Sequence, residues 1–137
     1  MWAISEDILS DELINEILDR ADYLISSNDL EKHVFVDKDF FSNNGDEPRN
    51  LDILNNIHKA VWSKISESFP YNEPVVDHAV LLFKKPGDVE TEWHQDRAYW
   101  ATRDKDASIF SVWIALEDIT EERGALNLIK SNEVSMS

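Results

Sequence analysis

A histidine and a carboxylate stand two residues apart in the stretch Glu92-Trp93-His94-Gln95-Asp96. In an extended chain, residues i and i+2 point to the same face, whereas in a helix they lie about 200° apart around the axis. His94 and Asp96 can therefore converge on one point only if this stretch is strand-like. An imidazole and a carboxylate are ligands for a divalent metal, and the 2-His-1-carboxylate site of non-haem Fe(II) needs one more histidine. The spacing predicts two ligands of a metal site.

The composition excludes several other kinds of site and partner. The chain has 137 residues, no cysteine and a formal net charge of −15, which excludes disulfides, zinc–thiolate sites and thiol nucleophiles. A surface this acidic repels phosphate backbones and anionic lipids, so we expect no nucleic-acid and no membrane partner. The segment Met1–Asp7 lacks the basic and apolar regions of a signal peptide, and no apolar run reaches membrane-spanning length. We expect a cytoplasmic protein.

Two amphipathic helices are predicted in the first half of the chain. The first opens at Ser10-Asp11-Glu12 and ends at Ser26-Ser27-Asn28-Asp29, and its apolar residues recur with a period of 3.6. The second runs from about Asn50 to Ser68, and Pro70 lies just past its end. Residues 31–50 are predicted to be irregular, with a loop over 42–48.

From Pro74 onward the apolar period changes to about two, which predicts strands. We expect strands over residues 75–85, 89–96, 107–116 and 125–129, with a turn at Pro86-Gly87-Asp88. Helices followed by strands favour the α+β class, with the helices packed on an antiparallel sheet. The length predicts a single domain over residues 1–137, mainly helical over 1–73 and strand-forming over 74–137.

Four motifs follow one another between Val80 and Ile129. They are Leu81-Leu82-Phe83-Lys84-Lys85-Pro86-Gly87, Trp93-His94-Gln95-Asp96 with Tyr99-Trp100, Val112-Trp113-Ile114-Ala115-Leu116, and Thr120-Glu121-Glu122-Arg123-Gly124-Ala125-Leu126. In this order they resemble the phytanoyl-CoA dioxygenase family of Fe(II)- and 2-oxoglutarate-dependent oxygenases. The resemblance implies a double-stranded β-helix (jelly roll), of which this chain holds the N-terminal helices and the first strands, as a partial and apparently truncated jelly roll.

The resemblance also implies roles for individual residues. His94 and Asp96 would be the first two iron ligands, and Gln95 and Trp113 would lie at the 2-oxoglutarate pocket. Lys84 or Lys85 would bring a basic group to the co-substrate or the substrate. The implied reaction hydroxylates a C–H bond of a small-molecule substrate while 2-oxoglutarate becomes succinate. Two further aromatic residues would line the substrate cavity, Tyr99 and Trp100. For all four flanking aromatic and amide side chains, plain packing in the core is the alternative.

The chain departs from the family pattern at the remaining ligands. No histidine follows His94, so the third ligand must come from upstream, come from another chain, or be missing. None of the arginines after Asp96 stands where the family anchors 2-oxoglutarate, these being Arg97, Arg103 and Arg123. One upstream candidate is His78, which would face Asp96 if residues 75–85 and 89–96 formed a tight hairpin.

Three explanations of this departure stay open at the level of sequence. The chain is a piece of a full oxygenase, or a homodimer that completes its open strand edges by strand exchange, or a relative that binds a ligand or partner without turnover. A metal hydrolase that uses His94 and Asp96 is a weaker function hypothesis, because such sites carry additional nearby ligands and only Glu92 is on hand. The sequence does not identify the substrate.

Overall fold

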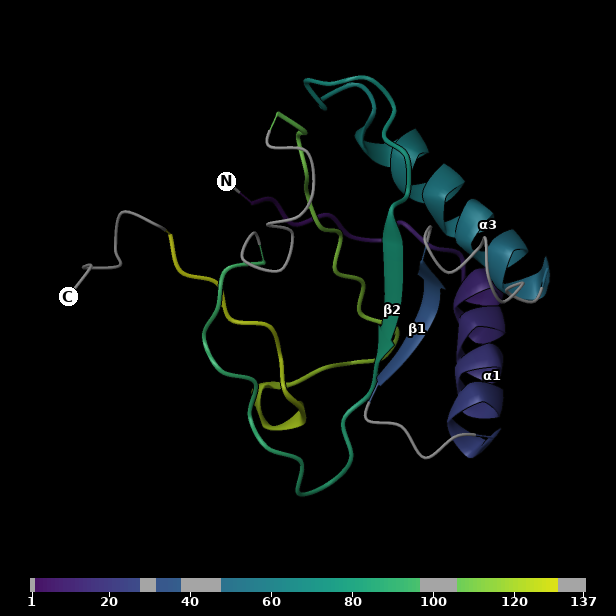
Figure 1. Ribbon diagram of the computed structural model, residues 1–137, viewed down its shortest axis with the longest axis vertical. Helices are drawn as coiled ribbons and strands as arrows, with labels where there is room; N and C mark the ends of the chain where they lie inside the picture. The colour runs from purple at the N-terminus through teal and green to yellow at the C-terminus, as the bar shows by residue number, and fades with distance from the viewer. Residues whose placement is uncertain (1, 28–31, 38–47, 97–105, 131–137) are drawn as a thin grey trace. The chain divides into compact units, whose positions relative to one another are not determined.

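The computed structural model describes residues 2–27, 32–37, 48–96 and 106–130 (Figure 1). The chain divides into two compact units, Met1–Phe83 and Lys84–Ser137. The first unit contains all of the described α-helices and strands, and the second contains the motifs around His94. The single domain over residues 1–137 stays a prediction.

Helix α1 spans Asp11–Ser27 and confirms the first predicted helix. The Leu13 backbone N–H donates to the Ser10 hydroxyl at 3.2 Å, so Ser10 caps the helix. The acidic Asp11 and Glu12 lie in the first turn, where the helix dipole favours negative charge. The buried face carries Ile17 and Leu24, two residues of the predicted apolar stripe. Local signals in the sequence therefore determine both the start and the orientation of α1.

Helix α3 spans Pro48–Ile65, close to the predicted second helix, and it contacts α1. Its side of the core is formed by Ile53, which is 0% exposed, together with Leu54 and Val61. Ile53 lies beside the stripe that the helical period predicts, and the structure shows it to be one of the two most fully buried large side chains. The helix ends three residues before the predicted Ser68, and turns continue from there.

A polar pair is buried between the two helices. Arg20 of α1 is 5% exposed, and its Nε donates to the Asn50 side-chain oxygen of α3 at 2.6 Å. The Arg20 guanidinium also lies 4.9 Å from the centre of the Tyr23 ring. Buried polar groups need such partners because leaving them unsatisfied destabilises the fold. This pair explains why a charged residue lies on the buried face of α1.

The segment after α3 folds back along the helix. Trp62 and Phe69 meet edge to face with ring centres 5.9 Å apart, and Phe69 meets Tyr71 in the same way at 5.6 Å. His58 Nε2 lies 2.9 Å from the carboxylate of Glu73. His58 is therefore engaged in holding this segment.

Strands β1 (Lys32–Asp37) and β2 (His78–Leu82) form a two-stranded antiparallel sheet, beside which α1 and α3 lie in Figure 1. The register pairs Lys32 with Leu82 and Asp37 with His78, with an irregularity between Val34 and Val36. The α+β class is thus confirmed in its mixed helix–strand content. The irregular structure predicted for residues 31–50 is wrong at β1 and at the start of α3, because pairing with β2 makes a strand of a short apolar segment.

The described part of the second unit consists of irregular chain, turns and the short 3₁₀-helix η2 (Glu121–Arg123). Lys85-Pro86-Gly87-Asp88 forms a β-turn in which Asp88 N–H donates to the Lys85 carbonyl at 3.0 Å. Proline at the second position and Gly87 at φ +89° match a type II turn, where the third position needs positive φ. The Asp88 carboxylate accepts from Lys85 N–H at 2.7 Å, which closes the turn a second time. The predicted turn at residues 86–88 is confirmed.

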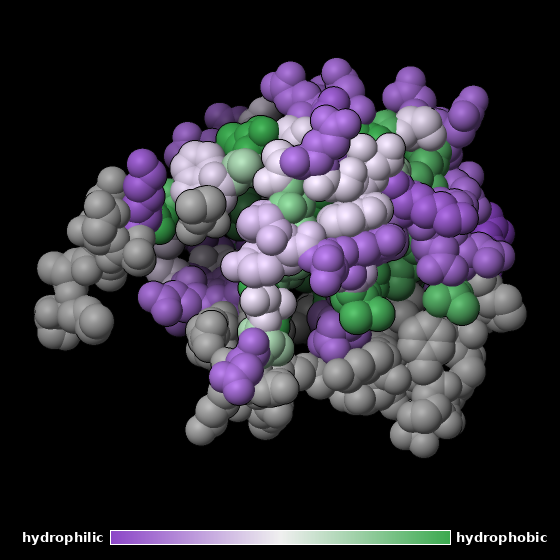
Figure 2. All heavy atoms as spheres, turned by 90° about the horizontal axis from the view of Figure 1, so that it is seen from above, coloured by the Kyte–Doolittle hydropathy of each residue, from purple (hydrophilic) through white to green (hydrophobic). Residues whose placement is uncertain are grey.

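The strands predicted over 89–96, 107–116 and 125–129 are wrong for this structure, in which residues 84–96 and 106–130 contain no strand. The strand predicted over 75–85 is confirmed only at its centre, as β2. A β-rich sequence becomes a strand only when another backbone pairs with it. Figure 2 shows hydrophobic residues between hydrophilic ones on the face that it draws. Within the described part of the second unit, the following large apolar side chains are exposed: Val89, Trp93, Ile109, Phe110, Val112, Trp113, Leu126, Leu128 and Ile129.

Candidate functional site

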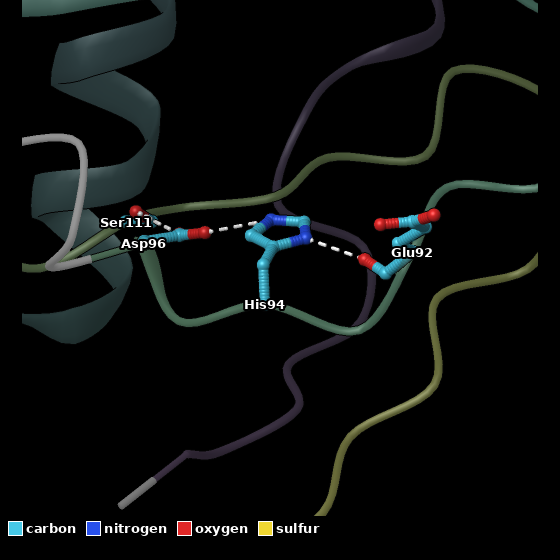
Figure 3. Close-up of polar contacts among 4 residues, drawn as sticks. All are labelled: Glu92, His94, Asp96 and Ser111. Carbon is cyan, nitrogen blue, oxygen red and sulfur yellow. Dashed lines mark hydrogen bonds and ion pairs between the residues drawn. The ribbon is translucent and has the colours of Figure 1, made fainter.

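The His94 and Asp96 side chains converge as the spacing predicts. His94 Nε2 lies 3.2 Å from Asp96 Oδ1, and the two side chains point toward one another in Figure 3. Gln95, which lies between them, belongs to no helix and no strand, and Asp96 lies at a 3₁₀ position. The expectation that the two side chains converge only in a strand is therefore wrong. Both side chains are open to solvent, with exposures of 41% and 52%.

The other ring nitrogen of His94 is held by the chain itself. His94 Nδ1 lies 2.8 Å from the backbone carbonyl oxygen of Glu92. A carbonyl oxygen only accepts hydrogen bonds, so Nδ1 carries the proton and donates it. In the neutral ring the lone pair then lies on Nε2, the nitrogen that faces Asp96. Metal-binding histidines are oriented in this way by a backbone carbonyl or a carboxylate.

The Asp96 carboxylate has a second partner on its far oxygen. The Ser111 hydroxyl donates to Asp96 Oδ2 at 3.0 Å, as the dashed line in Figure 3 shows. Oδ1 is the oxygen that faces His94. Ser111 thus orients the carboxylate and leaves Oδ1 directed at the point where a cation would lie.

The separation of the two ligand atoms fits a divalent metal. Two ligands about 2.1 Å from a metal and at right angles to each other lie about 3.0 Å apart, close to the observed 3.2 Å. A lone pair on Nε2 and a carboxylate oxygen repel at this distance unless positive charge lies between them. Either a second proton on the ring or a metal ion supplies that charge. The donor set therefore suits a cation such as Fe(II).

The other predicted site residues lie in the same unit. Lys84 Nζ donates to the Thr91 hydroxyl at 3.2 Å and approaches the Val89 carbonyl at 3.4 Å. Gln95 is exposed between the two ligands, and Trp113 is 44% exposed. Their roles at a 2-oxoglutarate pocket stay predictions.

Other sequence-based candidates do not join the pair. His78 pairs with Asp37 across β1 and β2, so the hairpin that would bring it opposite Asp96 is wrong. The Glu92 carboxylate lies on the Nδ1 side of the ring in Figure 3, away from Asp96. Within the described residues, no group of three or more histidine and acidic side chains is arranged to hold a metal. Four candidates lie outside the described residues: Arg97, Tyr99, Trp100 and Arg103.

Comparison with known proteins identifies the ancestry of this site. Residues 3–134 match the family described as Phytanoyl-CoA dioxygenase (PhyH). The chain belongs to the phytanoyl-CoA dioxygenase family. The resemblance seen in the motifs around His94 is thereby confirmed over almost the whole chain.

Among curated members of the phytanoyl-CoA dioxygenase family, one relative is the Phytanoyl-CoA dioxygenase domain-containing protein 1 of Danio rerio. It is 31% identical over 122 residues, which cover 77% of this chain and 42% of the relative. The chain thus spans less than half the length of that relative. No solved structure gives a significant match. No described helix combines the length and the hydrophobicity that crossing a bilayer requires.

Ser111 is the site residue that the sequence reasoning missed. A signal was present, because Ser111 interrupts the apolar run Ile109-Phe110-Ser111-Val112-Trp113 two residues before the predicted pocket tryptophan. The structure pairs this hydroxyl with the Asp96 carboxylate. Recognising the partner required the contact between segments 15 residues apart.

We expect the Ser111→Ala variant to bind Co(II), a spectroscopic substitute for Fe(II), about tenfold more weakly than the parent chain. Removing partners of metal ligands costs roughly tenfold to a hundredfold in affinity, and the exposed setting places this one at the lower end. Titration followed by Co(II) absorbance measures the affinity. Ser63→Ala, at an exposed position of α3, is the control, and equal affinities of the two variants would contradict the role of Ser111.

Proposed function

We propose that this chain carries the His–x–Asp part of an Fe(II)- and 2-oxoglutarate-dependent oxygenase that hydroxylates a small molecule. The supporting observation is the pair of ligand atoms 3.2 Å apart, on two side chains whose other polar atoms are each held by a hydrogen bond. Membership of the phytanoyl-CoA dioxygenase family supports the same reaction class. We further propose that the chain forms part of a jelly roll, that it can form a homodimer and that it is cytoplasmic.

The residues of the chain would act by binding and orienting. His94 would bind Fe(II) through Nε2, while the Glu92 carbonyl holds its ring in the correct tautomer. Asp96 would bind through Oδ1 and offset one of the two positive charges, while Ser111 holds Oδ2. When bound, Fe(II) supplies the chemistry by which a C–H bond, dioxygen and 2-oxoglutarate give an alcohol, succinate and carbon dioxide.

Two protein ligands leave several coordination positions open for a third side chain, 2-oxoglutarate and dioxygen. Gln95 and Trp113 are the proposed neighbours of 2-oxoglutarate, and the family resemblance supports these roles. Arg123 is engaged elsewhere, because its guanidinium donates to the Glu117 carboxylate at 3.0 Å and to the Asp118 carbonyl. We therefore do not assign the anchoring of 2-oxoglutarate to Arg123, and we assign the third iron ligand to no described residue.

The proposal is tested by measuring succinate formed from 2-oxoglutarate by the purified chain with Fe(II) and ascorbate. We expect Fe(II)-dependent succinate formation that the Asp96→Ala variant loses. Asp52→Ala, at an exposed position of α3, is the control for removing one carboxylate. Failure of the parent chain both to take up metal and to form succinate would exclude an oxygenase site in this polypeptide.

Metal uptake without succinate formation would instead favour the second candidate, a binding protein derived from the same fold. A measurement of molecular mass in solution accompanies both assays. A dimer would support strand exchange as the source of the third ligand, and a monomer would exclude it.

A further inference from the structure

Lys84 connects separate turns within the second unit. Its ammonium donates to the Thr91 hydroxyl at 3.2 Å and approaches the Val89 carbonyl at 3.4 Å. Lys84 stands directly before the type II turn over residues 85–88. The ammonium therefore ties the chain after this turn back to the residue that precedes it.

The aliphatic part of Lys84 lies against Gly124. A Cβ atom added at Gly124 would be 3.1 Å from Lys84 Cδ and 3.6 Å from Cε, so a larger residue there would press on the lysine. Gly124 has φ +86° and ends the short helix η2, Glu121–Arg123. Two backbone bonds close this end, from Gly124 to the Glu121 carbonyl and from Ala125 to the Thr120 carbonyl, both at 3.1 Å. The lysine thus lies against a well-defined turn.

Thr91, the residue that Lys84 holds, directly precedes Glu92. The Glu92 carbonyl accepts from His94 Nδ1, and His94 Nε2 faces Asp96. A displacement of the backbone at Thr91 would move the Glu92 carbonyl and with it the imidazole ring. The contacts of Lys84 are therefore linked to the geometry of the ligand pair through one peptide unit.

We propose that Lys84 is a positioning residue for the His94–Asp96 pair, acting through Thr91 and the Glu92 carbonyl. This inference rests on the proposed function, because it treats the pair as a metal site. It differs from the co-substrate contact that the family resemblance implies for Lys84. A co-substrate contact would affect the binding of 2-oxoglutarate, whereas a positioning contact affects the binding of the metal itself.

Removing the charge of Lys84 should change the affinity for Co(II) in opposite directions, depending on whether the lysine acts through its charge or by positioning the ligands. Deleting a positive charge near a cation site strengthens cation binding if charge alone matters. If Lys84 positions the ligands, the Lys84→Met variant, which keeps the aliphatic stem, should bind Co(II) about threefold to tenfold more weakly, chiefly through the loss of the hydrogen bond to Thr91. Thr91→Val, which removes the acceptor without changing charge, should weaken binding to a similar extent. Lys84→Arg, which keeps charge and donors, should retain most of the affinity.

The experiment measures Co(II) affinity by titration and backbone amide hydrogen exchange over residues 89–94 in the metal-free chain. Lys59→Met, an exposed residue of α3, controls for the change in net charge. Weaker Co(II) binding together with faster exchange in Lys84→Met and Thr91→Val supports the inference. Unchanged or tighter binding in Lys84→Met overturns it, even while the parent chain binds metal and the proposed function stands. A parent chain that binds no metal overturns the proposed function and the inference with it, and exchange then reports only a structural role.

Discussion

Replacing His94 by alanine is expected to lower the affinity of the chain for Co(II) or Fe(II) by at least about a hundredfold. Removing groups one step away from a metal already costs roughly tenfold to a hundredfold, and His94 supplies the ligand atom itself. Its Nε2 lies 3.2 Å from Asp96 Oδ1, and its Nδ1 is held by the Glu92 carbonyl. In the alanine variant Asp96 keeps its hydrogen bond from the Ser111 hydroxyl, and a single carboxylate binds a divalent ion weakly.

The matched control is His58→Ala. His58 and its partner Glu73 both belong to the first unit, whereas His94 belongs to the second. We expect the His58 variant to keep the metal affinity of the parent chain. His78→Ala is a second comparison, since the sequence left His78 open as a third ligand while the structure pairs it with Asp37. Equal losses in the His94 and His58 variants would point to adventitious binding by histidines and would overturn the assignment.

The parts of the fold that the sequence predicted are those that depend on neighbouring residues. Helix α1 follows from the Ser10 cap, the acidic first turn and the 3.6 period, all of which act within a few residues. The turn at 85–88 follows from Pro86 and Gly87 for the same reason. Local interactions can be read from a single sequence because both partners stand close together in it.

The strands show where this reasoning ends. Residues 107–116 have the composition of a strand, yet the structure gives them none, whereas Lys32–Asp37 form β1 through pairing with β2. A strand depends on a second backbone that periodicity does not identify. Arg20 likewise depends on a distant partner, because its position on the buried face of α1 requires the hydrogen bond to Asn50, 30 residues away.

In the candidate site, too, local relations could be predicted from the sequence and contacts between separate segments could not. The spacing of His94 and Asp96 indicated their convergence, but the strand on which that expectation depended does not form. The outer partner Ser111 and the position of Lys84 against Gly124 depend on contacts between separate segments. Sequence therefore indicated which atoms could bind a metal, and the structure indicates which residues would hold them in place.

Replacing Ile53 by alanine is expected to destabilise the first unit by about 3 kcal/mol. Ile53 is 0% exposed on α3, and truncating a buried isoleucine costs roughly 2–5 kcal/mol, because the lost apolar burial adds to the cost of the cavity. Urea unfolding followed by circular dichroism of the helices measures the loss as a lower midpoint. Ile4→Ala is the matched control, since Ile4 is 78% exposed in the same unit and the same truncation there should change the midpoint little. Similar midpoints for the two variants would mean that α1 and α3 do not pack around Ile53.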